Sequence, residues 1–542
     1  MIRNVFKKAH TYFKNKKKPP GSLTQSLANY LHSMEYNGLN KMAPFKDNTD
    51  RKYVFIGVGS VGRPSVHFLH EFIDVNYQNV HLVDQLDMRA VPSLQDVFKK
   101  GAKFTQKRLE DADWEPFFKE IGLKPYDMVI DLTTDTNGPK IVETLRKMSV
   151  MYMNTSVEVN WHYQTQDVYE ASLLSRYHTL NKIFLTTSDQ NNATQLFNFG
   201  MNPGVISHFA FQGLLDVANH VLKVKDDVLL AEFVAKKQYN LIAKHLELNT
   251  IHSSELDTQI SHNLKNDGTF VNTWSCIGLL EEGCEPAQVG WGTHERIIPE
   301  GGIILGREGV GFKDCAYKKL HQSWVPGHEF VGMVIPHDEA FSLNRALTAE
   351  NYSPTVHYVY RLPLQTKQMM ESMTVEELTK VNKWRVLNPY QDELTGEDIV
   401  GSLLIFAKNP ITGENKPWTY WFGSILGQGS SDFFGPTSMQ VCSGILTGLK
   451  YTVMNNNLGP IESEKVPTDF VMKHTLPYMG RVVSTEADWK PNSTQFSELS
   501  VNKKEVKGDS VPAKEKPIHM TNDWKINGFQ YGDASSPKSG IS

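Results

Sequence analysis

Three glycines near residue 60 have the spacing of a loop that binds the phosphates of a dinucleotide. Gly57, Gly59 and Gly62 form G-x-G-x-x-G directly after the short β-favouring run Tyr53–Ile56. In such a loop the first glycine allows a tight turn and the second lets the backbone approach a pyrophosphate. The third allows the following helix to pack closely. Apolar residues at helical spacing come next, so the order of strand, glycines and helix predicts a dinucleotide site.

An acidic residue follows where a carboxylate would contact the adenosine ribose. The β-favouring run Val80–Asp84 ends in Asp84, 22 residues after Gly62. A carboxylate at this position accepts hydrogen bonds from ribose hydroxyls and repels a 2′-phosphate, which favours NAD over NADP. Arg89 lies nearby in the sequence and leaves NADP open. The expected cofactor-binding residues are Gly57, Gly59, Ser60, Val61, Gly62, Asp84, Thr133 and Asn202.

The elements that must position this loop alternate between strands and helices. Further β-favouring runs lie at 128–132, 151–153 and 182–186, with helical segments between them. This alternation predicts an α/β fold with a Rossmann-type, doubly wound parallel sheet and a second mixed α/β domain. The apolar spacing within 439–453 predicts a buried helix.

The composition is that of a globular protein. The 542 residues carry a formal charge of −4, with 40% hydrophobic and 21% charged residues. There is no apolar run of about 18 residues, so we expect no membrane span, and the charge balance gives no reason to expect nucleic acid. Four widely spaced cysteines favour a reducing compartment, the cytoplasm. The adjacent pair His294 and Glu295 has no third ligand at metal-binding spacing, so we expect a structural turn there and no metal site.

Seven short segments, in the same order, resemble those of the bacterial-type homospermidine synthases, relatives of saccharopine dehydrogenase. They are Asn-Thr-Ser-Val-Glu (154–158), Met-Asn-Pro-Gly (201–204), Ile-His-Ser-Ser-Glu-Leu-Asp-Thr-Gln (251–259), Asn-Thr-Trp-Ser (272–275), Gly-Trp-Gly-Thr-His-Glu (290–295), Pro-Thr-Val-His-Tyr (354–358) and Thr-Ser-Met-Gln-Val (437–441). The likeness runs from about residue 52 to about residue 492.

This resemblance implies a specific activity. Such enzymes hold NAD as a bound redox relay, join two putrescines into homospermidine and release ammonia, and they form homodimers. The resemblance places the diamine-binding and catalytic residues at Asp135, Glu158, Asn202, Glu255, Trp274, Glu282, His337 and Glu339. Asp135 follows a predicted strand, where a contact to the nicotinamide ribose or a structural role is equally natural.

Composition at the two ends, together with the resemblance, implies a division of the chain. We expect a basic N-terminal extension over 1–51, an NAD-binding domain over 52–205 and a domain for substrate binding and dimerisation over 206–425. A return segment over 426–495 should pack on the first domain, and 496–542 should form a flexible tail. The site should lie between the domains, at the carboxyl edge of the parallel strands.

These residue types suit diamine chemistry. Burying a dication without partners costs several kcal/mol per charge, so a diamine site needs carboxylates. A base, Glu255 or Glu158, must remove a proton from the amine before hydride leaves the adjacent carbon. The ring face of Trp274 can stabilise the resulting iminium by roughly 0.5–2 kcal/mol. His337 can exchange protons while ammonia leaves. Each residue also has an ordinary structural interpretation, such as a core tryptophan or a turn-capping histidine.

Two other functions remain open at this stage. One is a saccharopine- or carboxyspermidine-type dehydrogenase with net redox chemistry, whose carboxylate-bearing substrates need Arg or Lys clamps. The other is a catalytically silent NAD-binding protein. The acids, Asn202 and Trp274 favour the diamine interpretation over both.

Overall fold

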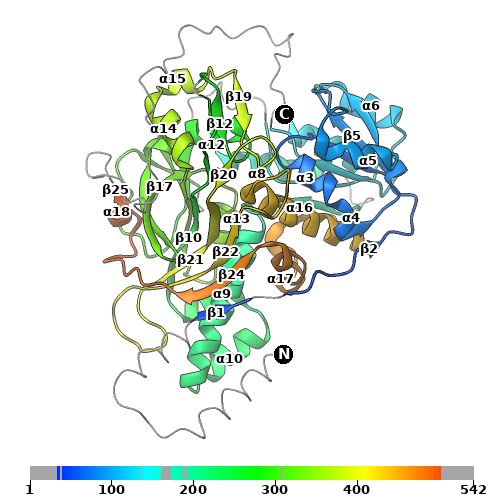
Figure 1. The fold of residues 1–542 in the computed structure, drawn as a ribbon. Coiled ribbons are helices and arrows are strands. Elements are labelled where there is room, and N and C mark those ends of the chain that lie inside the picture. Colours follow the sequence, from blue (N-terminus) through cyan, green and yellow to red (C-terminus); the bar gives the residue numbers. More distant parts are fainter. Residues whose placement is uncertain are drawn as a thin grey trace, which may run out of the picture.

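Two large β-sheets lie side by side, with helices between and around them (Figure 1). The computed structural model describes residues 33–36, 39–134, 136–159, 172–186, 192–265, 267–306 and 309–501. Among these residues, no helix combines the length and the apolar character needed to cross a lipid bilayer.

The first sheet has seven parallel strands and carries the glycine motif. Its strands, in spatial order, are β6 (Lys103–Gln106), β5 (Val80–Asp84), β3 (Tyr53–Ile56), β7 (Met128–Asp131), β8 (Met151–Asn154), β9 (Gln195–Phe197) and β23 (Pro460–Glu462). The chain runs outward from β3 to β6 and then crosses back to β7, so the strand order reverses between β3 and β7. Such a reversal opens a crevice at the carboxyl ends of the strands, where open α/β sheets bind ligands.

Short helices connect and cover these strands. They are α3 (Gly62–His67), α4 (Leu69–Phe72), α5 (Gln95–Lys99), α6 (Trp114–Glu120), α7 (Gly138–Lys147) and α8 (Leu173–Thr186). The predicted strand over 182–186 is therefore wrong, because these residues form the last turns of α8. A short apolar run does not distinguish a strand from a buried helix. Here Leu180, Ile183 and Phe184 have the spacing of one helix face and pack into the core under this sheet.

The second sheet is mixed and has twelve strands. Nine follow in the order β1 (Ser33–Glu35), β24 (Arg481–Glu486), β22 (Trp418–Gly427), β21 (Glu397–Phe406), β10 (Leu248–Asp257), β18 (Thr355–Arg361), β13 (Pro286–Gly290), β15 (Gly309–Cys315) and β14 (Gly302–Leu305). The others are β17 (His328–Ile335), which pairs with β18, β16 (Leu320–Val325), which pairs with β17, and β25 (Ser500–Val501), which pairs with β16. The observed architecture confirms the predicted fold class.

Two long helices join the sheets. Helix α9 (Val205–Val224) packs against β21 and β22. Helix α16 (Pro436–Met454) packs on α3 and places Ile445 and Leu449 in the core of the first sheet, which confirms the predicted buried helix.

The remaining elements are shorter. Helices are α10 (Val228–Ala235), α11 (Tyr239–His245), α12 (Cys276–Cys284), α13 (Glu339–Leu347), α14 (Leu364–Ser372), α15 (Val375–Leu378), α17 (Thr468–Thr475) and α18 (Phe496–Leu499). Three two-stranded pairs are β2 (Phe45–Lys46) with β4 (Ile73–Asp74), β11 (Ile260–Ser261) with β20 (Leu394–Thr395), and β12 (Phe270–Asn272) with β19 (Trp384–Val386). The expected tail over 496–542 thus starts with α18 and β25, and its part beyond residue 501 lies outside the described residues.

Candidate active site

One cavity of about 840 Å³ lies at the carboxyl edge of the first sheet and extends to the second domain. Most of the predicted site residues line it: Gly57, Gly59, Ser60, Val61, Asp84, Thr133, Glu158, Asn202, Glu255, Trp274, Glu282 and His337. Gly62 and Glu339 do not line the cavity themselves, but each contacts a residue that does: Gly62 contacts Gly57, and Glu339 contacts His337. Asp135 lies outside the described residues.

The glycine loop has the shape that a pyrophosphate needs. Gly57 has a φ of +82°, and a Cβ on it would lie 2.6 Å from the carbonyl oxygen of Leu132. A Cβ on Gly62 would lie 2.3 Å from the carbonyl oxygen of Gly57, so helix and turn meet here without room for a side chain. A Cβ on Gly59 would meet no atom within 4 Å, so this loop leaves open space beside the backbone. The residues therefore fit a dinucleotide.

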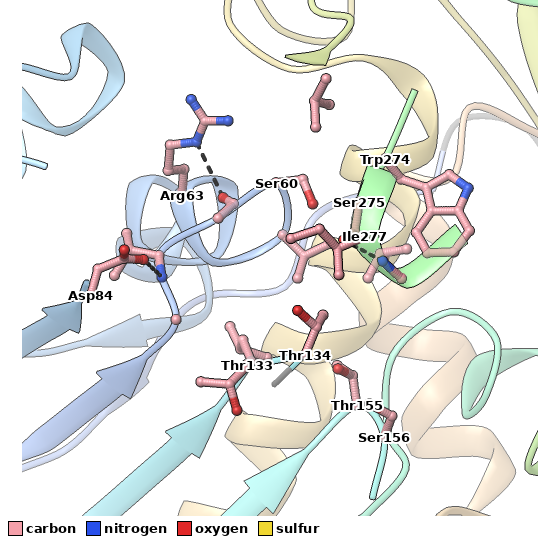
Figure 2. A pocket seen from close by; sticks show the side chains of 18 of the residues that line it. Ser60, Arg63, Asp84, Thr133, Thr134, Thr155, Ser156, Trp274, Ser275 and Ile277 are labelled. Carbon is pink, nitrogen blue, oxygen red and sulfur yellow. Dashed lines mark hydrogen bonds between the residues drawn. The ribbon is translucent and has the colours of Figure 1, made fainter. Parts of the chain in front are cut away.

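Asp84 is anchored beside this loop. Its Oδ2 accepts a hydrogen bond from the amide of Val58 at 2.7 Å, and its Oδ1 accepts one from the amide of Leu86 at 2.8 Å. Arg63 also lines the cavity and donates through Nε to the carbonyl of Gly59 (Figure 2). Arg89, which left NADP open in the sequence, is exposed and pairs with Asp87 at 2.7 Å.

Glu255 is a buried acid whose hydrogen bonds come from neutral donors. It lies on β10 and is 3% exposed. Its Oε2 accepts a hydrogen bond from Nδ2 of Asn202 at 2.8 Å and another from the hydroxyl of Tyr358. Burial raises the pKa of Glu255 to about 7, although these two hydrogen bonds oppose the rise. The carboxyl can therefore take up and release a proton near neutral pH.

His337 lies between two carboxylates. Its Nδ1 is 3.0 Å from Oε2 of Glu339, and its Nε2 is 3.6 Å from Oε1 of Glu282. Burial alone would lower the pKa of His337, but Glu339 and Glu282 outweigh burial and raise that pKa well above 6.5. The ring is therefore an imidazolium at neutral pH, and it packs edge-on against Tyr358 with the ring centroids 4.5 Å apart.

Glu158 lies in the loop after β8, beside a buried arginine. Burial raises the pKa of Glu158 to about 7, while the charge of Arg176 and a hydrogen bond from Ser156 act to lower it. Arg176 forms an ion pair with Glu285 at 2.9 Å and donates to the carbonyl of Val157 at 3.3 Å. The arginine thus balances part of the negative charge on this wall.

Trp274 lines the cavity beside Ser275 and Ile277, on the side away from Arg63 and Asp84 (Figure 2). Its indole Nε1 donates to the hydroxyl of Tyr360 at 3.1 Å. Tyr360 in turn stacks on Tyr358, with ring centroids 5.7 Å apart and planes 9° from parallel. This chain of contacts connects the indole to the tyrosine that hydrogen-bonds Glu255.

Sequence reasoning assigned no role to several wall residues, namely Tyr358, Arg176, Glu285 and Arg63. Tyr358 stands at the end of one of the seven shared segments, and Arg63 directly follows the third glycine, so both had a positional signal. Arg176 had none, because it reaches the cavity from the first turn of α8, a helix whose last residues the sequence pattern predicted as a strand.

Comparison with known proteins agrees with this architecture. The profile of the saccharopine dehydrogenase NADP binding domain matches residues 53–180, and that of the saccharopine dehydrogenase C-terminal domain matches residues 200–489, more than half of the chain. The homospermidine synthase of Blastochloris viridis is 25% identical over 472 residues, which cover 83% of this chain and 94% of that protein. The one of Mesorhizobium japonicum is 26% identical over 488 residues, covering 84% and 94%.

A solved structure shows the same fold. The crystal structure of homospermidine synthase from Legionella pneumophila, determined in complex with NAD, has a TM-score of 0.72 and 24% identity, and the match covers 85% of this chain and 99% of that chain. The resemblance inferred from the seven segments is therefore confirmed. This chain belongs to the saccharopine dehydrogenase family, and within it is similar to homospermidine synthases.

Proposed function

We propose that this protein is a homospermidine synthase that joins two putrescines into homospermidine and releases ammonia, with NAD as a bound hydride carrier. The observation that carries the proposal is the position of Glu255: a buried carboxyl that can exchange a proton near neutral pH, in the same cavity as the dinucleotide loop and Trp274. Bound NAD would accept a hydride from the carbon beside the amine nitrogen and later return it.

The residues of this chain would bind and deprotonate the amine. A diamine dication needs carboxylates along its path, and Glu158, Glu255 and Glu282 line the cavity. Hydride leaves only when the neighbouring nitrogen has a lone pair, so Glu255 must first take a proton from that ammonium. Asn202 and Tyr358 both bond Oε2 of Glu255, which leaves Oε1 to face the amine.

Charge stabilisation and proton donation then fall to two other side chains. The iminium formed by hydride loss stays cationic until the second amine attacks, and the ring face of Trp274 would stabilise it by roughly 0.5–2 kcal/mol. His337, as an imidazolium, can protonate the departing nitrogen so that it leaves as ammonia. Glu339 and Glu282 would then favour the return of a proton to the ring.

The rival dehydrogenase function needs a cation that is free to bind a substrate carboxylate. Two arginines that line the cavity, Arg176 and Arg385, are the candidates considered for this role. Arg176 pairs with Glu285 at 2.9 Å, and Arg385 pairs with Asp392 at 2.6 Å. A carboxylate clamp at either arginine would have to break an existing ion pair, which favours the diamine reaction.

Incubation of the purified protein with isotope-labelled putrescine and NAD tests the proposal. Mass spectrometry should detect labelled homospermidine and an equal amount of ammonia, while NADH does not accumulate. If NADH accumulates while an amine or amino acid is oxidised and no coupled product forms, the protein instead catalyses the net dehydrogenase reaction.

We also propose a homodimer, on the basis of the resemblance. Light scattering after size exclusion should then give twice the chain mass of 61.4 kDa.

A further inference from the structure

Three buried histidines meet on the face of the second sheet opposite to Glu255 and Tyr358. His252 and His357 are register partners on the parallel strands β10 and β18. Side chains alternate along a strand, so His252 and Glu255 point to opposite faces, as do His357 and Tyr358. His321 comes from β16. The ring centroids are 4.5–5.2 Å apart, and one nitrogen from each ring lies within 4.8 Å of the others.

Burial favours the neutral form of all three rings, in which one ring nitrogen carries a lone pair. Each has no exposed surface, and burial lowers the pKa of all three, that of His321 to about 4. Unlike His337, none of them has a carboxylate among its hydrogen-bond partners in the described structure. Neutral imidazole is the form in which histidine binds metal ions.

The hydrogen bonds of His252 turn one lone pair toward the cluster. Its Nδ1 is 3.0 Å from the hydroxyl oxygen of Ser323, and the proton of that hydroxyl goes to Ser254 at 3.0 Å. Nδ1 of His252 must therefore donate, so the lone pair is on Nε2. That nitrogen is buried and has no hydrogen-bond partner in the described structure.

His321 and His357 present the other nitrogens. Nε2 of His321 is 3.2 Å from the carbonyl oxygen of Phe496, and donation to this carbonyl would leave the lone pair on Nδ1. Nδ1 also lies 3.1 Å from the carbonyl oxygen of Gln322, and a neutral ring cannot donate to both carbonyls. Nδ1 of His357 is buried and has no partner among the described residues.

One pair of ring nitrogens has the spacing of two metal ligands, and the three candidate ligand nitrogens all lie within 4.8 Å of one another. Nε2 of His357 lies 3.4 Å from Nδ1 of His321. Two nitrogens bound about 2.0–2.1 Å from a tetrahedral zinc are about 3.3–3.4 Å apart. Imidazoles that bind metals donate their second nitrogen to a carbonyl or another oxygen, as His252 does to Ser323 and as His321 would do to Phe496 with a metal on Nδ1.

We propose that His252, His321 and His357 bind a structural transition-metal dication, zinc in the first instance. An all-imidazole ligand set favours zinc, copper, nickel or iron over the oxygen-preferring Mg²⁺ and Ca²⁺, and the fourth position would hold water or hydroxide. The ion would cross-link β10, β16 and β18, and through the Phe496 carbonyl it would hold α18 against them. Two of these strands carry Glu255 and Tyr358 on their other face, so the metal would stiffen the sheet beneath the active site.

Metal content and metal response of the full-length protein test the site. The protein, expressed with added zinc and purified without chelator, should hold about one zinc per chain by inductively coupled plasma mass spectrometry. After chelation, one equivalent of Zn²⁺ should raise the thermal midpoint of the apoprotein. One equivalent of Co²⁺ should give the visible absorption of a four-coordinate ion.

Substitutions locate the metal. H252Q and H357Q should each lose the zinc and the thermal response, whereas H262A, at an exposed histidine outside the cluster, should keep both. If the variants fail to fold, the Co²⁺ spectrum and the thermal response of the wild-type chain to Zn²⁺ decide whether the protein binds a metal ion. Absence of zinc together with no response to either ion overturns the proposal, as does zinc retained in H252Q and H357Q or lost in H262A.

Discussion

Two buried histidines, one in the cavity wall and one in the helical core, differ in charge at neutral pH: the first is an imidazolium and the second is neutral. His337 is 8% exposed and His208 has no exposed surface. His337 contacts Glu339 and Glu282, and its pKa rises well above 6.5. His208, on α9, contacts the hydroxyl of Thr468 and the carbonyl of Ser463, and burial lowers its pKa to about 4.

This difference shows that partners, rather than burial, decide whether a buried group is charged. Desolvation disfavours the charged form of both rings. Only the carboxylates beside His337 are strong enough to reverse it. The same reasoning applies to Glu255, whose partners Asn202 and Tyr358 are neutral, so its pKa settles near neutrality rather than at either extreme.

The largest effect is expected from removing the carboxyl of Glu255, the acid whose hydrogen-bond partners are neutral. Glu255→Gln keeps the shape and the hydrogen-bonding capacity of the side chain but cannot take a proton. We expect the coupling rate to fall about 10²–10⁴-fold, the usual contribution of a general base. Binding of NAD, measured by calorimetry, should stay unchanged. Glu397→Gln, at an exposed position on the neighbouring strand β21, is the matched control and should leave the rate unchanged. Loss of NAD binding in Glu255→Gln would contradict the assignment.

The second test removes each carboxylate partner of His337 in turn. Glu339 is fully buried at 3.0 Å, whereas the side chain of Glu282 is 25% exposed and lies at 3.6 Å. Breaking a buried ion pair costs about 3–5 kcal/mol, and an exposed one costs about 1 kcal/mol or less. Denaturant unfolding at pH 6 should therefore show a much larger loss for Glu339→Gln than for Glu282→Gln. Equal losses would mean that the ion pair with Glu339 does not hold the charge on His337.

The third test uses the pH dependence of stability, whose sign should differ for the two histidines. The pKa of folded His208 is lowered, so its contribution is complete above about pH 6.5 and is lost as pH falls toward 4. The pKa of folded His337 is raised, so its contribution is complete below about pH 6.5 and is lost as pH rises through the folded value. His208→Gln should thus destabilise by about 2 kcal/mol less at pH 5 than at pH 7. His337→Asn should lower the free energy of unfolding less at pH 8.5 than at pH 6. If the losses in both variants change with pH in the same direction, the two histidines do not differ in charge as described.

Local patterns in the sequence predict one half of the cavity well. The glycine spacing, Asp84 and the apolar runs describe consecutive segments, so the dinucleotide loop and most of the parallel sheet follow from them. The end of helix α8 was predicted incorrectly as a strand because a run of three apolar residues within 182–186 fits either structure.

The other half depends on contacts between distant segments. Glu255 meets Tyr358 because β10 and β18 are neighbours in the second sheet, although the residues are 103 positions apart. The ion pair of Arg176 with Glu285 and the meeting of three histidines on the opposite face of these strands are likewise products of tertiary structure. Resemblance to a family located several of these acids, but their partners and charges appear only in the fold.

The smallest test concerns the hydroxyl that holds Glu255. Tyr358 donates to the carboxylate and stabilises its charged form, so Tyr358→Phe should raise the pKa of Glu255 further. A hydrogen bond to a charged group contributes about 1.5–3 kcal/mol, and one pKa unit corresponds to about 1.4 kcal/mol. The acidic limb of the profile of kcat/KM against pH should therefore move up by about one to two pH units, with the rate largely recovered at high pH. Tyr360→Phe is the control, because it removes a hydroxyl that bonds Trp274 and not Glu255. The acidic limb of its profile should stay at the wild-type pH. A Tyr358→Phe profile that falls equally at every pH would show that the hydroxyl positions the substrate rather than tuning the base.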